Sequence, residues 1–154
     1  MAMTRGDARE LAVHLIYSQT FTGDEPEQIV AARLEKNYYE KLAEENEVYS
    51  ERPRGAQRAY IDTVVTGVIN RMDALNAIIQ QYSISWDVSR ISRLARTIMQ
   101  LAIYEIQNVA DVPVGVAVSE AVRLAKKYDG GDTGAFVNGI LGAYVRSLNS
   151  EDVK

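Results

Sequence analysis

The sequence predicts an all-α fold, a compact bundle of six to seven helices. Apolar residues recur at spacings of three and four along most of the 154 residues, which is the period of a helix with one buried face. No segment shows the alternation of apolar and polar residues that a half-buried strand requires. Glycine and proline stand between the periodic segments, where they end one helix and begin the next. A chain of this length can bury a full core without metals or crosslinks.

The N-terminal half is expected to cover about residues 4–82. Its first helix starts near Thr4, because Thr4 and Asp7 stand in the order of a capping box, and it ends at Gly23 and Pro26. The other elements expected here are a helix at 27–45 with Tyr38 facing inward, a loop at 47–55 and one long helix at 56–82.

The C-terminal half is expected to cover about residues 86–148. Asp87 or Ser89 can cap a helix at 90–108. Pro113 then falls in the first turn of the next helix, where its missing N–H costs nothing.

That next helix is expected to continue to Tyr128, with Val114 among its core residues. Gly130-Gly131 supplies a left-handed stop, a conformation that residues with a Cβ resist. The last helix should run from about Asp132 or Thr133 to Ser147. Residues 1–149 would then form a single helical domain, and residues 150–154 a frayed tail.

The composition argues against several kinds of site. The chain has no cysteine, which excludes disulfides, thiolate nucleophiles and sulfur-ligated metals. Its one histidine, His14, has no companion for a metal or a catalytic triad, and no glycine-rich phosphate loop is present. We therefore expect no enzymatic activity, no cofactor and no metal. The start resembles no targeting peptide and no apolar run approaches the roughly 20 residues of a membrane span, so the expected location is cytoplasmic.

Charge is distributed unevenly along the chain. The formal net charge is −4, which does not by itself indicate a nucleic-acid binder. Residues 24–51 contain nine acidic and three basic residues, whereas the rest of the chain contains 14 bases and 12 acids. Any RNA-binding surface should therefore be local and lie outside residues 24–51.

A series of short motifs is sharpest after Trp86. An Arg- and Leu-rich helix ends in Tyr104-Glu105. It is followed by Val112-Pro113, by Glu120-Ala121-Val122, by Leu-Ala-Lys-Lys-Tyr at 124–128 and by Phe-Val-Asn-Gly-Ile-Leu at 136–141. In this order and spacing, the motifs resemble those of the NusB family of bacterial transcription antitermination factors, and the similarity spans nearly the whole chain.

The resemblance implies two packed three-helix groups and no catalysis. It implies binding of single-stranded boxA RNA in ribosomal RNA leader transcripts, jointly with the small-subunit ribosomal protein NusE. The pair would join RNA polymerase and other Nus factors and suppress premature termination. Members of this family occur as monomers and as homodimers, and the sequence does not choose between them.

The resemblance, together with residue chemistry, points to seven candidate RNA contacts. Cationic side chains bind phosphates, and aromatic rings stack on unpaired bases. The candidates are Arg5, Arg9, Tyr17, Lys126, Lys127, Asp132 and Phe136. Members of the family often begin with several adjacent arginines, whereas Gly6 and Asp7 separate Arg5 from Arg9 here, so weak RNA affinity without the partner is expected.

Each candidate also has a purely structural interpretation. Arg5 or Arg9 could pair with a neighbouring carboxylate, and Tyr17 could be a surface or partner-packing residue. Asp132 could cap the last helix, and Phe136 could belong to the core.

Two other functions remain open from sequence. One is a non-catalytic helical adaptor whose acidic half binds a basic protein. The other is a stand-alone relative of the RNA-binding domain that precedes the catalytic domain of ribosomal RNA cytosine methyltransferases. The chain ends about seven residues after the expected last helix, so we expect no methyltransferase domain to follow.

Overall fold

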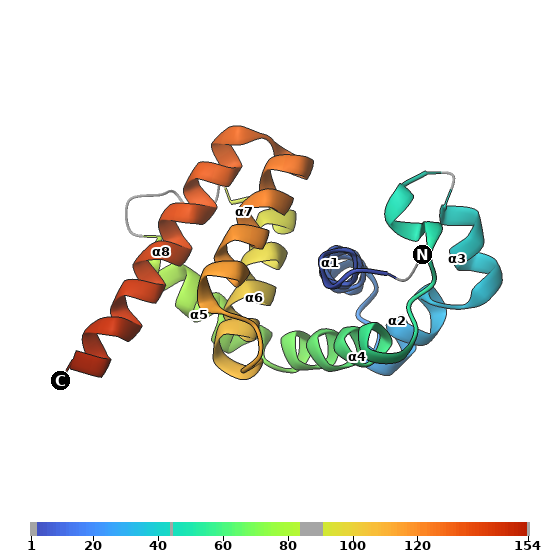
Figure 1. Cartoon of the computed structure of the whole chain (residues 1–154), viewed down its shortest axis with the longest axis horizontal. Coiled ribbons are helices and arrows are strands. Elements are labelled where there is room, and N and C mark those ends of the chain that lie inside the picture. The colour runs from blue at the N-terminus through green and yellow to red at the C-terminus, as the bar shows by residue number, and fades with distance from the viewer. Residues whose placement is uncertain (1–2, 44, 84–90, 154) are drawn as a thin grey trace. The chain divides into compact units, whose positions relative to one another are not determined.

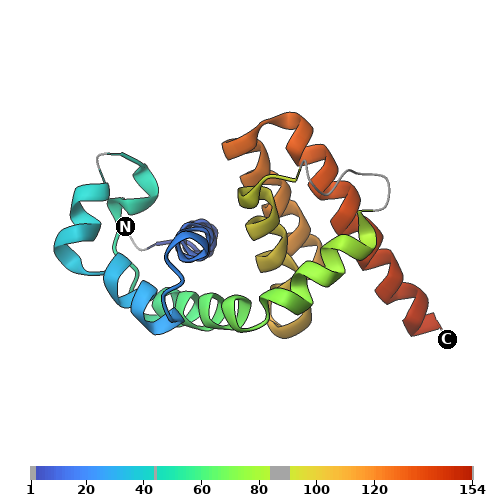
Figure 2. The ribbon, with the colours of Figure 1, turned by 180° about the vertical axis from the view of Figure 1, so that it is seen from behind.

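A computed structural model describes residues 3–43, 45–83 and 91–153, and every regular element in these ranges is a helix (Figures 1 and 2). This confirms the all-α prediction, although the described ranges contain eight α-helices and one 3-10 helix where six to seven helices were expected. Chain contacts divide the protein into two compact units, Met1–Asn70 and Arg71–Lys154. No helix in the described ranges is both long and apolar enough to cross a membrane.

The first unit is built around its N-terminal helix. Its elements are α1 (Arg5–Thr22), α2 (Pro26–Arg33), α3 (Lys36–Leu42), the 3-10 helix η1 (Glu47–Ser50) and α4 (Gly55–Asn70). Helix α1 crosses α4 and also contacts α2 and η1 (Figure 1). Its buried residues include Ala8, Leu11, Leu15 and Ile16, the stripe that the helical period predicts.

The ends of α1 form as predicted. The Thr4 hydroxyl accepts a hydrogen bond from the Asp7 backbone N–H at 3.0 Å, which satisfies one of the unpaired donors of the first turn. At the other end Gly23 has φ 70°, and its N–H donates to the carbonyl of Gln19. The left-handed conformation of Gly23 therefore ends the helix.

The prediction of a single helix at 27–45 is wrong. The chain leaves the helical conformation at Leu34, and the Glu35 carboxylate accepts hydrogen bonds from the N–H groups of Asn37 and Tyr38 at 3.1 and 2.8 Å, so it caps a new helix. These bonds lower the pKa of Glu35. The break shifts the helical phase, so that Tyr39 is 1% exposed and Tyr38, predicted to face inward, is 44% exposed.

The expected loop at 47–55 contains η1 and is tied to α3. The Tyr39 hydroxyl donates to the backbone carbonyl of Glu51 at 2.6 Å and lies 3.3 Å from that of Val48. The rings of Tyr39 and Tyr49 meet edge to face at 5.2 Å. Arg33 and His14 both hydrogen-bond the Tyr49 hydroxyl, at 3.1 and 2.7 Å, which connects η1 to α2 and α1.

Burial raises the pKa of Tyr39 above its usual value of about 10. In the unfolded chain the Tyr39 hydroxyl loses its proton above about pH 10, whereas the folded chain retains this proton to higher pH. Above about pH 10 the unfolded state therefore binds fewer protons than the folded state. This contribution to stability is complete below about pH 10 and is lost as the pH rises towards the folded pKa. We expect Tyr39→Phe to reduce the fall in urea midpoint between about pH 8 and pH 11. The control is Tyr38→Phe, and equal slopes for the two variants would contradict the expectation.

The second unit contains four helices. They are α5 (Met72–Tyr82), α6 (Arg93–Asn108), α7 (Val114–Asp129) and α8 (Gly131–Val153). Helix α7 packs against α6 and α8, and α5 packs across α6 and α8 (Figure 2). Their contact buries large apolar side chains such as Ile98, Leu124 and Leu141.

The division into halves differs from the prediction. The expected helix 56–82 is interrupted at Arg71 (φ −121°, ψ 19°), and α5 packs with the C-terminal helices. The two units therefore divide between Asn70 and Arg71, and not between residues 82 and 86. The sequence does not reveal this break, because the segments before and after Arg71 each keep an apolar face at the helical period.

Several helix ends also differ from the prediction. The Ser92 hydroxyl caps α6 by accepting from the Ala95 N–H at 3.0 Å, so α6 begins at Arg93; the proposed caps Asp87 and Ser89 lie outside the described residues. Val114, expected in the core, is 39% exposed at the start of α7. Helix α8 continues to Val153, beyond the expected end at Ser147, and residues 148–153 contain neither glycine nor proline to stop it.

Candidate nucleic-acid interface

Arg5 lies on the first turn of α1, and its guanidinium is held from two sides. Its Nε donates to the Gln57 side-chain oxygen at 2.9 Å, and its Cζ lies 4.3 Å from the centroid of the Tyr60 ring. Both partners belong to α4. The residue is only partly buried. A guanidinium fixed in this way loses less conformational entropy when it binds an anion.

Arg9 stands one turn further along the same face of α1. Its Cζ is 5.9 Å from the centroid of the same Tyr60 ring, which confirms that the two arginines share a face. Arg9 is only 4% exposed, however, and the adjacent Glu10 is 2% exposed. This burial favours a role for Arg9 in holding Tyr60 and Arg5, while direct phosphate contact by Arg9 stays a prediction.

Tyr17 lies near the C-terminal end of α1 and is partly exposed. Its ring meets the ring of Phe21 edge to face, at 5.1 Å and an interplanar angle of 76°. Phe21 is 62% exposed, which places a large apolar ring in water one helical turn beyond Tyr17. The pair forms an aromatic surface of the kind that stacks unpaired bases.

Phe21 is not among the RNA contacts that the sequence predicted. Its spacing of four residues from Tyr17, off the buried stripe of α1, is the signal that could have identified it.

The other four candidate residues surround the turn between α7 and α8. Lys126 and Lys127 are exposed in the last turn of α7, and Lys127 Nζ lies 5.4 Å from the centroid of the Tyr128 ring. Asp132 is exposed in the first turn of α8, and Phe136 is partly buried one turn later. Phe136 is therefore not a fully buried core residue.

Asp132 does not cap α8. That helix already begins at Gly131, so Asp132 lies inside its first turn, where a carboxylate interacts favourably with the helix dipole. The turn between the helices is a single residue, Gly130, with φ 96° and ψ 175°. Lys126 packs closely against α8, since a Cβ added at Gly134 would lie 2.5 Å from Lys126 Cγ. The structure thus brings Lys126 beside the start of α8, as the sequence suggested.

Each unit therefore carries one group of candidates. In the first, Arg5 and Arg9 meet at Tyr60, while Tyr17 pairs with Phe21 further along α1. In the second, all four candidates flank Gly130. Among the residues that the structure describes, no group of three or more metal-ligating side chains comes together.

Comparison with known proteins identifies the family. The model of the NusB family matches residues 6–146. The transcription antitermination protein NusB of Acetivibrio thermocellus is 38% identical over 144 residues, which are 94% of this chain and 90% of that protein. The protein of the same name from Thermoanaerobacter sp. (strain X514) is 31% identical over 150 residues, 97% of this chain and 96% of its own length.

Solved structures share the fold. NusB of T. maritima superposes with a TM-score of 0.68 at 24% identity, covering 93% of this chain and 91% of that one. A chain from the crystal structure of antitermination factors NusB and NusE in complex with dsRNA gives a TM-score of 0.72 at 22% identity, covering 96% of this chain and 99% of that one. Because the family match and the relatives extend over nearly the full length, the chain belongs to the NusB family of transcription antitermination proteins.

Proposed function

We propose that this protein binds single-stranded boxA RNA of ribosomal RNA leader transcripts jointly with NusE, and that the complex suppresses premature termination together with RNA polymerase and other Nus factors. The observation that carries the proposal is the arrangement along α1. A cation held by Gln57 and Tyr60 stands at one end, and the Tyr17–Phe21 pair, in which Phe21 is exposed and Tyr17 partly exposed, stands at the other. Phosphate binding and base stacking are the two contacts that single-stranded RNA needs.

Along α1, Arg5 supplies the phosphate contact, and Arg9 supports it through Tyr60. Twelve residues separate Arg5 from Tyr17, a rise of about 18 Å along the helix. One RNA strand would therefore contact the two places through different nucleotides.

The turn after α7 provides the second group of contacts. Lys126 and Lys127 supply charge, Phe136 supplies a ring edge, and the carboxylate of Asp132 accepts hydrogen bonds from base amino groups. Acceptance by a carboxylate favours bases with exocyclic amines, so Asp132 would contribute to sequence preference.

The net charge of −4 explains the need for a partner. Long-range attraction for RNA is weak in an acidic protein, and a basic ribosomal protein adds the missing positive charge. A structural relative that was solved with NusE and dsRNA shares this fold, which supports NusE and RNA as partners but not the single-stranded form of the RNA.

The proposal is tested by measuring the binding of a short boxA RNA and a scrambled RNA, with and without NusE, over a range of salt concentrations. A preference for boxA that increases with NusE, and an affinity that falls steeply with salt, are expected. Absence of any preference in both conditions would reject RNA recognition. It would favour instead an adaptor that binds a basic protein through residues 24–51.

Replacing Arg5 by glutamine should weaken boxA binding about fivefold and reduce the salt slope by about 0.7, the value for one phosphate contact to a single strand. The matched control is Arg58→Gln on α4, which removes the same charge from an arginine that is paired with Asp62 at 3.2 Å. NusE binding should be unchanged in both variants. An equal loss of RNA binding in the control would show that only net charge matters at this end of α1.

A further inference from the structure

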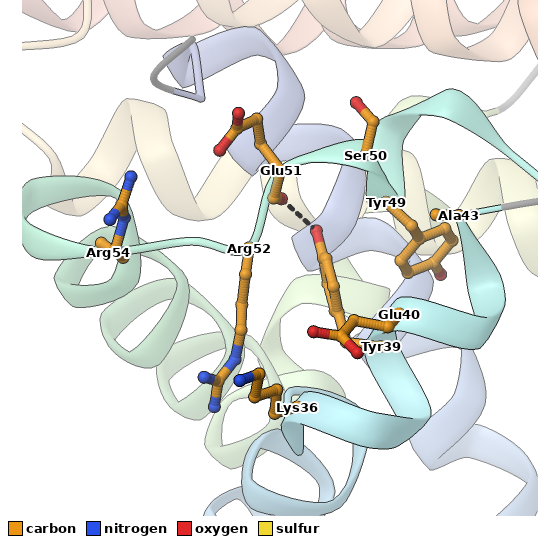
Figure 3. A pocket seen from close by; sticks show the side chains of 9 residues that line it. All are labelled: Lys36, Tyr39, Glu40, Ala43, Tyr49, Ser50, Glu51, Arg52 and Arg54. Atoms are coloured by element: carbon orange, nitrogen blue, oxygen red, sulfur yellow. Dashed lines mark hydrogen bonds between the residues drawn. The ribbon is translucent and has the colours of Figure 1, made fainter.

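A pocket of about 420 Å³ opens in the first unit between α3, η1 and the segment that leads into α4 (Figure 3). None of the seven candidate RNA contacts lines it. The pocket therefore needs an explanation beyond the proposed RNA-binding surface.

The floor of the pocket is rigid. Tyr39 and Tyr49 are 1% and 6% exposed and pack edge to face at 5.2 Å. The Tyr39 hydroxyl donates to the Glu51 carbonyl at 2.6 Å, the bond drawn in Figure 3. Buried rings held by a hydrogen bond do not collapse into the space above them, so the floor of the pocket keeps its shape when a ligand binds.

Two cationic side chains, Arg52 and Lys36, line the pocket. Arg52 Nε donates to the carbonyl of Leu34 at 3.0 Å, which anchors its guanidinium, and Figure 3 shows the Lys36 amine pointing to the same place. Within the described residues neither side chain forms an ion pair shorter than 4 Å, and the Arg52 Nη groups make no hydrogen bond. Both side chains are exposed, and in Figure 3 they extend toward the same part of the pocket, where an anion would offset their mutual repulsion.

Three acidic side chains lie nearby. Glu51 lines the pocket, and Figure 3 shows its carboxylate on the side away from the Arg52 guanidinium. The Glu35 carboxylate, although close enough to be affected by Arg52, already accepts two backbone hydrogen bonds at the start of α3. Glu40 lines the pocket from the next turn of α3, and Figure 3 shows its carboxylate beside Tyr39. Arg54 also lines the pocket and adds a third positive charge. The five charged residues of the lining leave one net positive charge.

We propose that the pocket between α3 and η1 binds a phosphate group, with Arg52 and Lys36 as its direct contacts. The planar guanidinium can donate two parallel hydrogen bonds to phosphate oxygens, and the ammonium adds a point charge. A terminal phosphate carries about two negative charges and so matches the cation pair, whereas a phosphate of an RNA backbone carries one. The phosphate can belong to a small nucleotide or to an RNA backbone.

The test follows backbone amide NMR signals of residues 36–54 in the full chain during titration with inorganic phosphate at constant ionic strength. Saturable shifts confined to the pocket are expected. Arg52→Gln and Lys36→Gln should each weaken binding about tenfold, as for a hydrogen bond to a charged group. Glu40→Gln should strengthen it about threefold, because a repelling charge is removed. The control is Lys41→Gln, an exposed lysine of the same helix that does not line the pocket and should bind phosphate normally.

Competition identifies the source of the phosphate. Displacement by AMP but not by an RNA oligonucleotide indicates a small nucleotide, displacement by the oligonucleotide indicates an RNA backbone, and displacement by neither indicates free phosphate. Equal shifts with acetate, or equal weakening in the Lys41 variant, would overturn the proposal. Arg5→Gln should leave phosphate binding intact, so failure here is distinguishable from failure of the α1 assignment.

Discussion

Replacing Gly130 by alanine is expected to lower the free energy of unfolding by about 2 kcal/mol, because its conformation is nearly inaccessible to residues with a Cβ. Gly130 alone forms the turn between α7 and α8, with φ 96° and ψ 175°. An added Cβ would meet no other atom within 4 Å, so the cost comes from the backbone conformation and not from a clash. The measurement is the urea midpoint at constant slope.

The neighbouring glycine provides the control. Gly131 begins α8 with no positive φ, and a Cβ there would also lie in open space. Gly131→Ala should therefore be neutral or stabilising by up to about 1 kcal/mol. Equal destabilisation by the two substitutions would show that Gly130 is not uniquely constrained. Loss of boxA binding by Gly130→Ala, with the fold retained, would further indicate that the turn positions Lys126 and Asp132.

Phe21→Ala is expected to weaken boxA binding about tenfold or more, the cost of losing one stacked base. The salt dependence should remain unchanged, because no charge is removed. At 62% exposure the ring contributes little to the core, so the unfolding free energy should change only slightly. This pattern is the reverse of that expected for Arg5→Gln, where the salt slope decreases.

Two further variants separate stacking from simple apolar contact. Phe21→Trp should retain binding because the larger ring still stacks, whereas Phe21→Leu should resemble alanine. If the leucine variant binds RNA as well as the original protein does, the aromatic surface is not a stacking platform. An unchanged RNA affinity together with weaker NusE binding would assign Phe21 to the protein partner.

The sequence predicted most helices because an amphipathic helix displays its period locally. The start of α1 and its end at Gly23 depend on residues within one turn, and they formed as expected. The breaks at Leu34 and Arg71 were missed. At both places the residues are compatible with a continuous helix. After Leu34 the Glu35 carboxylate caps a new helix and the Arg52 side chain binds the Leu34 carbonyl. After Arg71 the new helix packs against α6 and α8.

The candidate contacts show the same limit. The spacing of four residues puts Arg5 and Arg9 on one helix face, yet it does not reveal that Arg9 is almost completely buried against Tyr60, 51 residues later in the chain. The sequence correctly predicted a helix start near Asp132, but the helix begins one residue earlier, at Gly131. The residue type does not distinguish Phe21 from a core residue, and only the structure shows that its side chain is largely exposed.

By itself, the sequence determined the all-α class, the family and the two stretches that carry the candidate RNA contacts, since these depend on periodicity and on ordered local motifs. Only the tertiary structure decided where the two units divide, which tyrosine of the pair Tyr38 and Tyr39 is buried, and that Arg52 and Lys36 line one pocket. The physical reason is that burial and the meeting of side chains depend on contacts between distant segments, and those contacts leave no local period in the sequence.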